Sequence, residues 1–243
     1  MALVLLMGPS ESALAESASA SPGPCRSLLY SIFWNGMPAG KAVLRCALSD
    51  DRAVVTLTGR TEALMDAVYP VTFEAESLLA ADSLAARRYR EKTREGRAKD
   101  KTELLVFGQD KIAGEDKIAV DVFKNGRLRR TLPVPLGTLD PLGALYRFLG
   151  DSGNRNPFLV TDGRRVFEVH MMPGRREEVA TPSGRRSVQV WDAAVKVISG
   201  KPHVLEKASI RVWTSADDPF TMWKAAVALP YGVFSTQKVD EEL

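Results

Sequence analysis

Hydrophobic and polar residues alternate with a period of two along most of the chain, and the apolar runs are short. Residues 53–58 (AVVTLT) and 186–198 (RSVQVWDAAVKVI) are examples, and glycine, proline, asparagine or aspartate bounds most such runs. Side chains on a β-strand point alternately to the two faces of a sheet, so the pattern predicts strands. Turns recur about every 8–12 residues, which is typical of an antiparallel sandwich, barrel or curled sheet.

One segment departs from this period and predicts the clearest helix of the chain. Asp140 can accept hydrogen bonds from the free N–H groups of a first turn, and Pro141 suits the first helical position. Gly150 predicts the end of the helix. A single apolar stripe is formed by Leu142, Leu145, Tyr146 and Leu149. We expect this helix to cover a sheet face that would otherwise be exposed to water.

The first 24 residues indicate export. A short apolar stretch at 2–7 precedes small residues at 13–15 and 18–20, which is the order of a signal-peptide core and its cleavage site. The basic region that normally comes first is missing. We interpret residues 1–20 as a remnant signal peptide whose start codon was assigned too late, with a disordered leader as the alternative. Residues 25–240 then form a single β-rich domain in the periplasm.

The two cysteines give an independent indication of the compartment. Asn35-Gly36 is the strongest short hairpin signal, because a type I′ turn needs positive φ at both central residues. Counted outward from a two-residue loop, Cys25 faces Cys46 at a pair whose Cα atoms lie about 4.5 Å apart. We therefore predict a Cys25–Cys46 disulfide and an oxidising compartment. A loop of four or five residues would shift the register and leave two thiols.

Composition and motifs narrow the function classes. The chain has 243 residues, of which 45% are hydrophobic and 26% charged, as in ordinary globular proteins. No apolar run approaches the ~18 residues of a membrane-spanning helix. A net charge of +3 is too small to indicate nucleic acid as a partner. The sequence contains no phosphate-binding loop, nucleophile elbow or Cys/His metal spacing, so we expect no cofactor and no metal.

Catalysis would have to use one of a few candidate side chains. His170 lies in a strand pattern near Glu168, and His203 follows a proline in a turn, so we expect both to be structural. Asp217 and Asp218 are adjacent and would point to opposite faces of a strand. A hydrolase of envelope components that uses His170 or Asp217 is the alternative. It requires a pocket in which either residue meets a serine or cysteine.

Basic residues form pairs and one dense segment. Arg164–Arg165, Arg175–Arg176 and Arg185–Arg186 each follow a glycine that predicts a turn. If these turns are successive, the first and third pairs lie at one end of the sheet and the second pair lies at the other. Residues 87–101 are rich in lysine and arginine, which predicts an edge hairpin whose charges block pairing with another sheet. Contact with anionic lipid head groups or lipopolysaccharide is the alternative.

Aromatic residues gather in the early and late parts of the chain. On strands, large rings mostly belong to the core. The functional alternative is an apolar groove on the concave face of a curved sheet, which would hold an acyl chain or a partner peptide. The candidates for its lining are Tyr30, Trp34, Tyr146, Trp213 and Trp223.

Five segments, in order, resemble one protein family. They are LLYSIFWNGMPAGKAVL, DPLGALYRFL, DGRRVFEVHM, TPSGRRSVQVWDAAVKV and IRVWTSADDPFTMWKAAVALPYG. Over roughly residues 28–238 the chain resembles the domain of unknown function 3108 family of exported bacterial proteins. The matching positions are Tyr30, Trp34, Gly36, Gly40, Asp140, Pro141, Tyr146, Gly184, Trp213, Ser215 and Asp217. The chain departs from the family at Gly143, where serine is common, and at Phe220, close to a common arginine.

The resemblance implies export and a curled, half-barrel-like antiparallel sheet wrapped around one central α-helix. It implies no established activity. We expect a mainly β, monomeric, non-catalytic periplasmic protein that binds a lipid or lipoprotein-like ligand, or an envelope protein, on the concave face. A structural scaffold whose own helix fills that face is a further alternative. A cavity larger than a few water molecules would argue against the scaffold.

Overall fold

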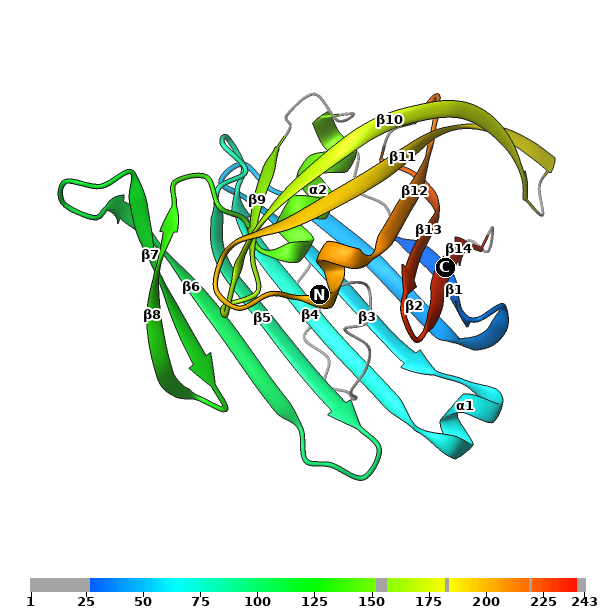
Figure 1. Ribbon diagram of the computed structural model, residues 1–243, viewed down its shortest axis with the longest axis horizontal. Helices are drawn as coiled ribbons and strands as arrows, with labels where there is room; N and C mark the ends of the chain where they lie inside the picture. The colour runs from blue at the N-terminus through cyan, green and yellow to red at the C-terminus, as the bar shows by residue number, and fades with distance from the viewer. Residues whose placement is uncertain (1–26, 152–156, 182–183, 219, 240–243) are drawn as a thin grey trace.

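Fourteen strands, two α-helices and one 3-10 helix make up the residues that the computed structural model describes, 27–151, 157–181, 184–218 and 220–239 (Figure 1). The strands of the first half are β1 (Leu28–Trp34), β2 (Met37–Leu48), β3 (Arg52–Thr61), β4 (Val71–Ala80), β5 (Ala86–Glu95), β6 (Lys101–Lys111), β7 (Lys117–Lys124) and β8 (Arg127–Pro135). Those of the second half are β9 (Phe158–Thr161), β10 (Val166–Thr181), β11 (Gly184–Ser199), β12 (Ser209–Ser215), β13 (Met222–Leu229) and β14 (Gly232–Lys238). The helices are α1 (Ala63–Val68), α2 (Pro141–Asp151) and the 3-10 helix η1 (Val204–Lys207).

All fourteen strands belong to one antiparallel sheet, which confirms the mainly β, antiparallel part of the predicted fold class. The wrapping of the sheet around one central helix stays a prediction. The strand order is β8-β7-β6-β5-β4-β3-β2-β1-β14-β13-β12-β11-β10-β9, so two meanders meet at the β1–β14 pair. The edge strands are β8 and β9, and the segment between them carries α2. Leu139 in this segment forms a parallel bridge with Val160 of β9. The sheet is nearly closed and barrel-like, which is more complete than the predicted half-barrel.

Helix α2 begins at Pro141, as predicted, and ends one residue beyond Gly150. It contacts β3, β4 and β9. In Figure 1 the long β10–β11 hairpin arches over it. The helix therefore packs against strands of both meanders.

The first hairpin forms the predicted two-residue turn. Asn35 and Gly36 have φ values of 49° and 79°, the left-handed conformation that a type I′ turn requires. Trp34 pairs with Met37 directly beside the turn. The Asn35 N–H also donates to the Val233 carbonyl of β14 over 2.8 Å, which ties this turn to the second meander.

Beyond the turn, the register of this hairpin differs from the prediction. A β-bulge next to Phe33 displaces every later pair by one residue, so that Leu28 lies opposite Leu44. The register from which we predicted that Cys25 faces Cys46 is therefore wrong past the bulge. Cys25 lies outside the described residues, so the disulfide itself stays a prediction.

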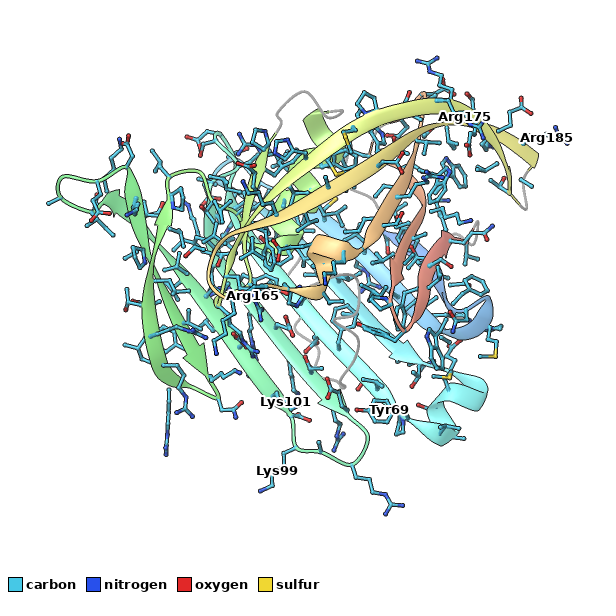
Figure 2. All side chains as sticks on the ribbon, in the orientation of Figure 1. Tyr69, Lys99, Lys101, Arg165, Arg175 and Arg185 are labelled. Atoms are coloured by element: carbon cyan, nitrogen blue, oxygen red, sulfur yellow. The ribbon has the colours of Figure 1, made fainter. Side chains whose placement is uncertain are left out.

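The β10–β11 hairpin corrects the expected positions of the arginine pairs. Instead of turning at residues 173–174, β10 continues through them with a β-bulge just beyond Pro173. One long hairpin of β10 and β11 is therefore present where the sequence predicted three strands joined by two turns. Figure 2 shows Arg175 and Arg185 toward one end of this hairpin and Arg165 at the other. The second and third arginine pairs thus lie toward the same end of the sheet, and the first pair lies at the opposite end.

The basic segment 87–101 lies in the middle of the first meander. β5 pairs with β4 and β6, and β6 pairs with β7, so the predicted edge position is wrong. Ion pairs neutralise part of its charge: Lys92 lies 3.1 Å from Asp100, and Lys101 lies 3.2 Å from Glu95. These charges protect no sheet edge.

Asp140 and Gly143 fit the first turn of α2 closely onto β4. Asp140 is fully buried, and its Oδ1 accepts hydrogen bonds from the N–H groups of Leu142 (3.0 Å) and Gly143 (2.9 Å). Its Oδ2 accepts a hydrogen bond from the Ser77 hydroxyl (2.7 Å). A Cβ at position 143 would lie 2.9 Å from Leu79 Cδ2 and 3.0 Å from the Asp140 carboxylate. A side chain at position 143 would therefore force Leu79 to shift, and Ser77 supplies a hydroxyl at this place.

We expect Gly143→Ala to lower the free energy of unfolding by about 1–2 kcal/mol, although alanine favours helix more than glycine does. The added methyl overlaps Leu79 Cδ2, and Leu79 is completely buried. Urea unfolding of the single variant and of the same change in a Leu79→Val background measures this. The loss should shrink in that background, because valine lacks the overlapping atom. A stabilising effect of Gly143→Ala in the natural protein would contradict the packing described.

Candidate functional site

An apolar cavity of about 210 Å³ opens between α2 and the strands β9–β13. α2 contributes Ala144, Leu145 and Phe148 to its wall. The sheet contributes mostly aliphatic residues from five strands, and η1 contributes Leu205. The volume exceeds the ~150 Å³ of an apolar cavity that holds a benzene ring. The cavity can therefore accept a segment of a hydrocarbon chain.

The period-two pattern of the sequence builds the sheet side of this cavity. Val169 and Met171 of β10 face it, as do Ala193 and Val195 of β11. The residue between the last two, Ala194, is exposed on the opposite face. Alanine at an inward position leaves space that a larger side chain would fill, and this is why the strands enclose a cavity instead of a filled core.

Asp162 is the one ionisable residue that lines the cavity, and other groups hold it in place. Its Oδ1 accepts hydrogen bonds from the N–H groups of Arg164 (2.8 Å) and Arg165 (2.7 Å). Its Oδ2 lies 2.9 Å from Nη1 of Arg165, and only 6% of its side chain is exposed. Asp162 therefore closes the turn before β10 and has little capacity left to bind or react with a ligand.

Asp140, beneath α2, gives the protein a specific pH dependence. Burial raises its pKa from 3.8 to about 6, against the opposing effect of the hydrogen bonds from Gly143, Ser77 and Leu142. Between pH 4 and pH 6 the folded protein therefore binds more protons at this carboxyl than the unfolded chain does. Its contribution lowers the free energy of unfolding as the pH rises through this window, by up to about 3 kcal/mol.

The variant Asp140→Asn isolates this contribution, because asparagine caps a helix as well as aspartate does but does not titrate. We expect the Asn variant to gain stability relative to the natural protein as the pH rises from 4 to 7. Urea unfolding of both proteins at four pH values measures the difference. A difference that stays constant over this range would show that the Asp140 pKa is not raised.

Three of the five predicted lining residues, two on the inner side of the sheet and one on α2, lie outside this cavity. Tyr30 is buried, and its hydroxyl donates to the Met222 carbonyl over 2.9 Å. Trp34 stacks on Phe234, with ring centroids 6.4 Å apart. Tyr146 borders a much smaller cavity between α2 and β1–β3. In this structure all three rings fill space within the protein.

The other two predicted residues also lie away from the cavity. Val212 lines the cavity, so its neighbour Trp213 points to the outer face, where Nζ of Lys224 lies 4.9 Å from its ring centroid. Trp223 is buried, and Nζ of Lys238 lies 4.6 Å from its ring. The residues that build the cavity are instead mainly the inward aliphatic residues of β9–β13, which sequence reasoning did not select.

The candidate catalytic side chains lie away from the cavity. His170 precedes the cavity residue Met171 and points outward, where its Nε2 lies 2.8 Å from Glu168 Oε1. Asp217 follows β12, and its N–H donates to the Ser215 hydroxyl over 3.3 Å. Within the described part of the chain, neither His170 nor Asp217 borders the apolar cavity.

Sequence reasoning also missed a pair of carboxylates on the inner side of β5 and β6. Glu91 and Glu103 are cross-strand partners. The hydroxyls of Tyr89 (3.0 Å) and Thr93 (3.1 Å) donate to Glu91, and Arg164 lies 3.5 Å from Glu103. Burial raises the pKa of Glu91 above its ordinary value. The alternation of Tyr89, Glu91 and Thr93 along β5 is the signal that could have placed Glu91 on the inner face.

Among the described residues, no three His, Cys, Asp or Glu side chains gather where they could hold a metal ion. None of the helices in the described ranges is long and apolar enough to cross a membrane. The expectations about metals and cofactors stay predictions.

The fold and the cavity together define a β-barrel-like protein built from a single antiparallel sheet. The chain belongs to DUF3108, a family of proteins of unknown function, whose model matches residues 29–238. This confirms the resemblance found from the sequence motifs. No curated protein matches the chain significantly.

Among solved structures, the chain is similar to the beta-barrel-like protein of domain of unknown function DUF1849 from Brucella abortus. The TM-score is 0.62 at 13% sequence identity, and the match covers 88% of this chain and 95% of that chain. At this identity the similarity shows the fold alone.

Proposed function

We propose that this protein is a non-catalytic binding protein of the periplasm that holds the apolar part of a lipid or lipoprotein-like ligand. The observation that carries the proposal is the cavity of about 210 Å³ between α2 and β9–β13, whose lining is apolar apart from Asp162. Burial of hydrocarbon in such a cavity is favourable by roughly 25 cal/mol per Å² of apolar surface. The sheet then acts as a rigid wall and α2 as the inner surface against which the chain packs.

The cavity favours ligand binding over a purely structural scaffold. A water molecule occupies about 30 Å³ of liquid, so this volume corresponds to about seven water molecules, which is more than the few trapped waters of a scaffold. An apolar cavity also offers water almost no hydrogen-bond partners. A scaffold whose own helix fills the concave face would leave no such space.

The hydrolase alternative finds less support. It depends on a pocket where His170 or Asp217 meets a serine or cysteine. His170 is instead paired with Glu168 on the outer face, and Asp217 lies in the turn after β12. The periplasmic location is proposed from the leader-like residues 1–20 and from the exported family that the sequence motifs resemble.

The experiment is a titration of the delipidated full chain with cis-parinaric acid, a fatty acid whose fluorescence rises in an apolar environment. We expect saturable binding at one site and displacement by dodecanoate. A signal that does not saturate, or that dodecanoate does not displace, would contradict the proposed function. Mass spectrometry of lipids that co-purify from the native periplasm would then identify the ligand.

A further inference from the structure

A second cavity, of about 200 Å³, continues the apolar one along the same strands. On β11, Ala193 lines the apolar cavity and Trp191 lines the second one. On β12, Val212 lines the first cavity and Thr214 lines the second. Alternate residues of a strand are only about 7 Å apart, so the two cavities adjoin. Phe148 of α2 borders both.

Two aromatic rings form the boundary between the cavities. Phe148 and Trp191 meet edge to face, with centroids 5.4 Å apart. The indole N–H of Trp191 donates to the Thr214 hydroxyl over 3.0 Å, which holds this ring in place. A hydrocarbon chain that lies in the apolar cavity would therefore leave it beside these rings and end in the second cavity.

The β-bulge in β10 brings Arg176 to the inner face at this point. Pro173 pairs with Trp191, and an uninterrupted ladder would next pair Arg175 with Gln189. The bulge adds one residue, so Arg176 pairs with Gln189 instead and shares its face of the sheet. Arg175 is turned outward, and 85% of its side chain is exposed.

Arg176 is the one charged residue that lines the second cavity, beside Thr214 and Ser215. Among the described residues it forms no ion pair, whereas Arg175 lies 3.0 Å from Glu177 Oε1. A guanidinium group binds a carboxylate or a phosphate through two parallel hydrogen bonds. A cationic end that adjoins an apolar cavity is complementary to an amphiphile with an anionic head.

We propose that the second cavity is a head-group pocket in which Arg176 binds the carboxylate or phosphate of an acyl amphiphile. The chain of this ligand occupies the apolar cavity, so the inference rests on the proposed function. It narrows the ligand from any apolar molecule to one with an anionic head group. Phe148 and Trp191 then surround the first part of the chain, next to the head.

The test is calorimetric titration of the full chain with three ligands that share one chain length: dodecanoate, dodecyl phosphate and 1-dodecanol. For the natural protein we expect the anionic ligands to bind about tenfold more tightly than the alcohol. Arg176→Ala should remove this preference and leave the affinity for 1-dodecanol unchanged. Arg175→Ala, the matched control on the outer face, should leave all three affinities unchanged. The anion that loses more affinity in Arg176→Ala identifies the preferred head group.

Two results would overturn the head-group pocket while the proposed function stands. One is an Arg176→Ala variant with unchanged affinities, and the other is an equal loss for the alcohol and the anions, which would reflect a structural role. If 1-dodecanol and both anions fail to bind the natural protein, the proposed function itself fails, and the head-group pocket fails with it.

Discussion

Replacement of Ala193 by tryptophan is expected to weaken the binding of cis-parinaric acid by on the order of tenfold or more. Ala193 lies on β11 with its methyl group toward the apolar cavity. On the same face of this strand, Trp191 precedes it and Val195 follows it. An indole at this position occupies much of the 210 Å³ that the ligand chain would use. The fluorescence titration of the natural protein and the variant measures the loss directly.

Ala194→Trp is the matched control, because Ala194 is the next residue of the same strand and is exposed on the opposite face. It adds the same ring to the protein and should leave the affinity for cis-parinaric acid unchanged. Thermal unfolding of both variants should show that the fold is retained. Equal affinity in Ala193→Trp and Ala194→Trp, with both proteins folded, would place the ligand elsewhere.

Leu79→Ala is expected to lower the free energy of unfolding by about 3–5 kcal/mol. Leu79 is completely buried on the inner face of β4, and its Cδ2 atom lies against Gly143 of α2. Truncation leaves a void under the first turn of the helix, and the hydrogen bond from Ser77 of β4 to Asp140 limits how far the helix can move into the space. Urea unfolding at pH 7 measures the loss.

The neighbouring residue Leu78 provides the comparison for this change. It lies on the outer face of β4 and is half-buried, so Leu78→Ala should cost only about 1 kcal/mol. A similar loss in the two variants would mean that α2 is not packed on β4 as described. Because α2 also forms one wall of the cavity, the Leu79→Ala variant should bind cis-parinaric acid more weakly as well.

Local signals in the sequence predicted the elements whose geometry is set by a few adjacent residues. Asn35 and Gly36 form the predicted type I′ turn, which requires the positive φ values that both residues adopt. Asp140 and Pro141 start helix α2, as predicted. Residues 173–174 have the composition of a turn, yet β10 runs through them. The pairing of β10 with β11 along almost their whole length outweighs this local turn preference. Proline is tolerated there because the ladder between β9 and β10 stops at the pair Val169–Phe158, so no described strand pairs with β10 on that side of Pro173.

The strand order and the cavity could not be predicted in the same way. Pairing of β1 with β14 depends on contacts between the two ends of the chain, and no local pattern indicates it. Sequence reasoning took its candidates for the ligand site from the large aromatic rings, which on strands mostly belong to the core. In the structure Trp34 and Tyr30 fill space, whereas the cavity forms where inward positions carry small residues such as Ala193 and Ala225. The useful signal was the small size of inward residues.

The most direct measurement of the central claim is an NMR experiment on protein with ¹³C-labelled methionine methyl groups and unlabelled dodecanoate. Met171 and Met222 line the apolar cavity, whereas Met172, the neighbour of Met171, is exposed on the outer face. We expect nuclear Overhauser contacts from the ligand chain to the methyl groups of Met171 and Met222, and none to that of Met172. Contacts to Met172 in place of Met171, or no contact to any of the three in a saturated complex, would contradict ligand binding between α2 and β9–β13.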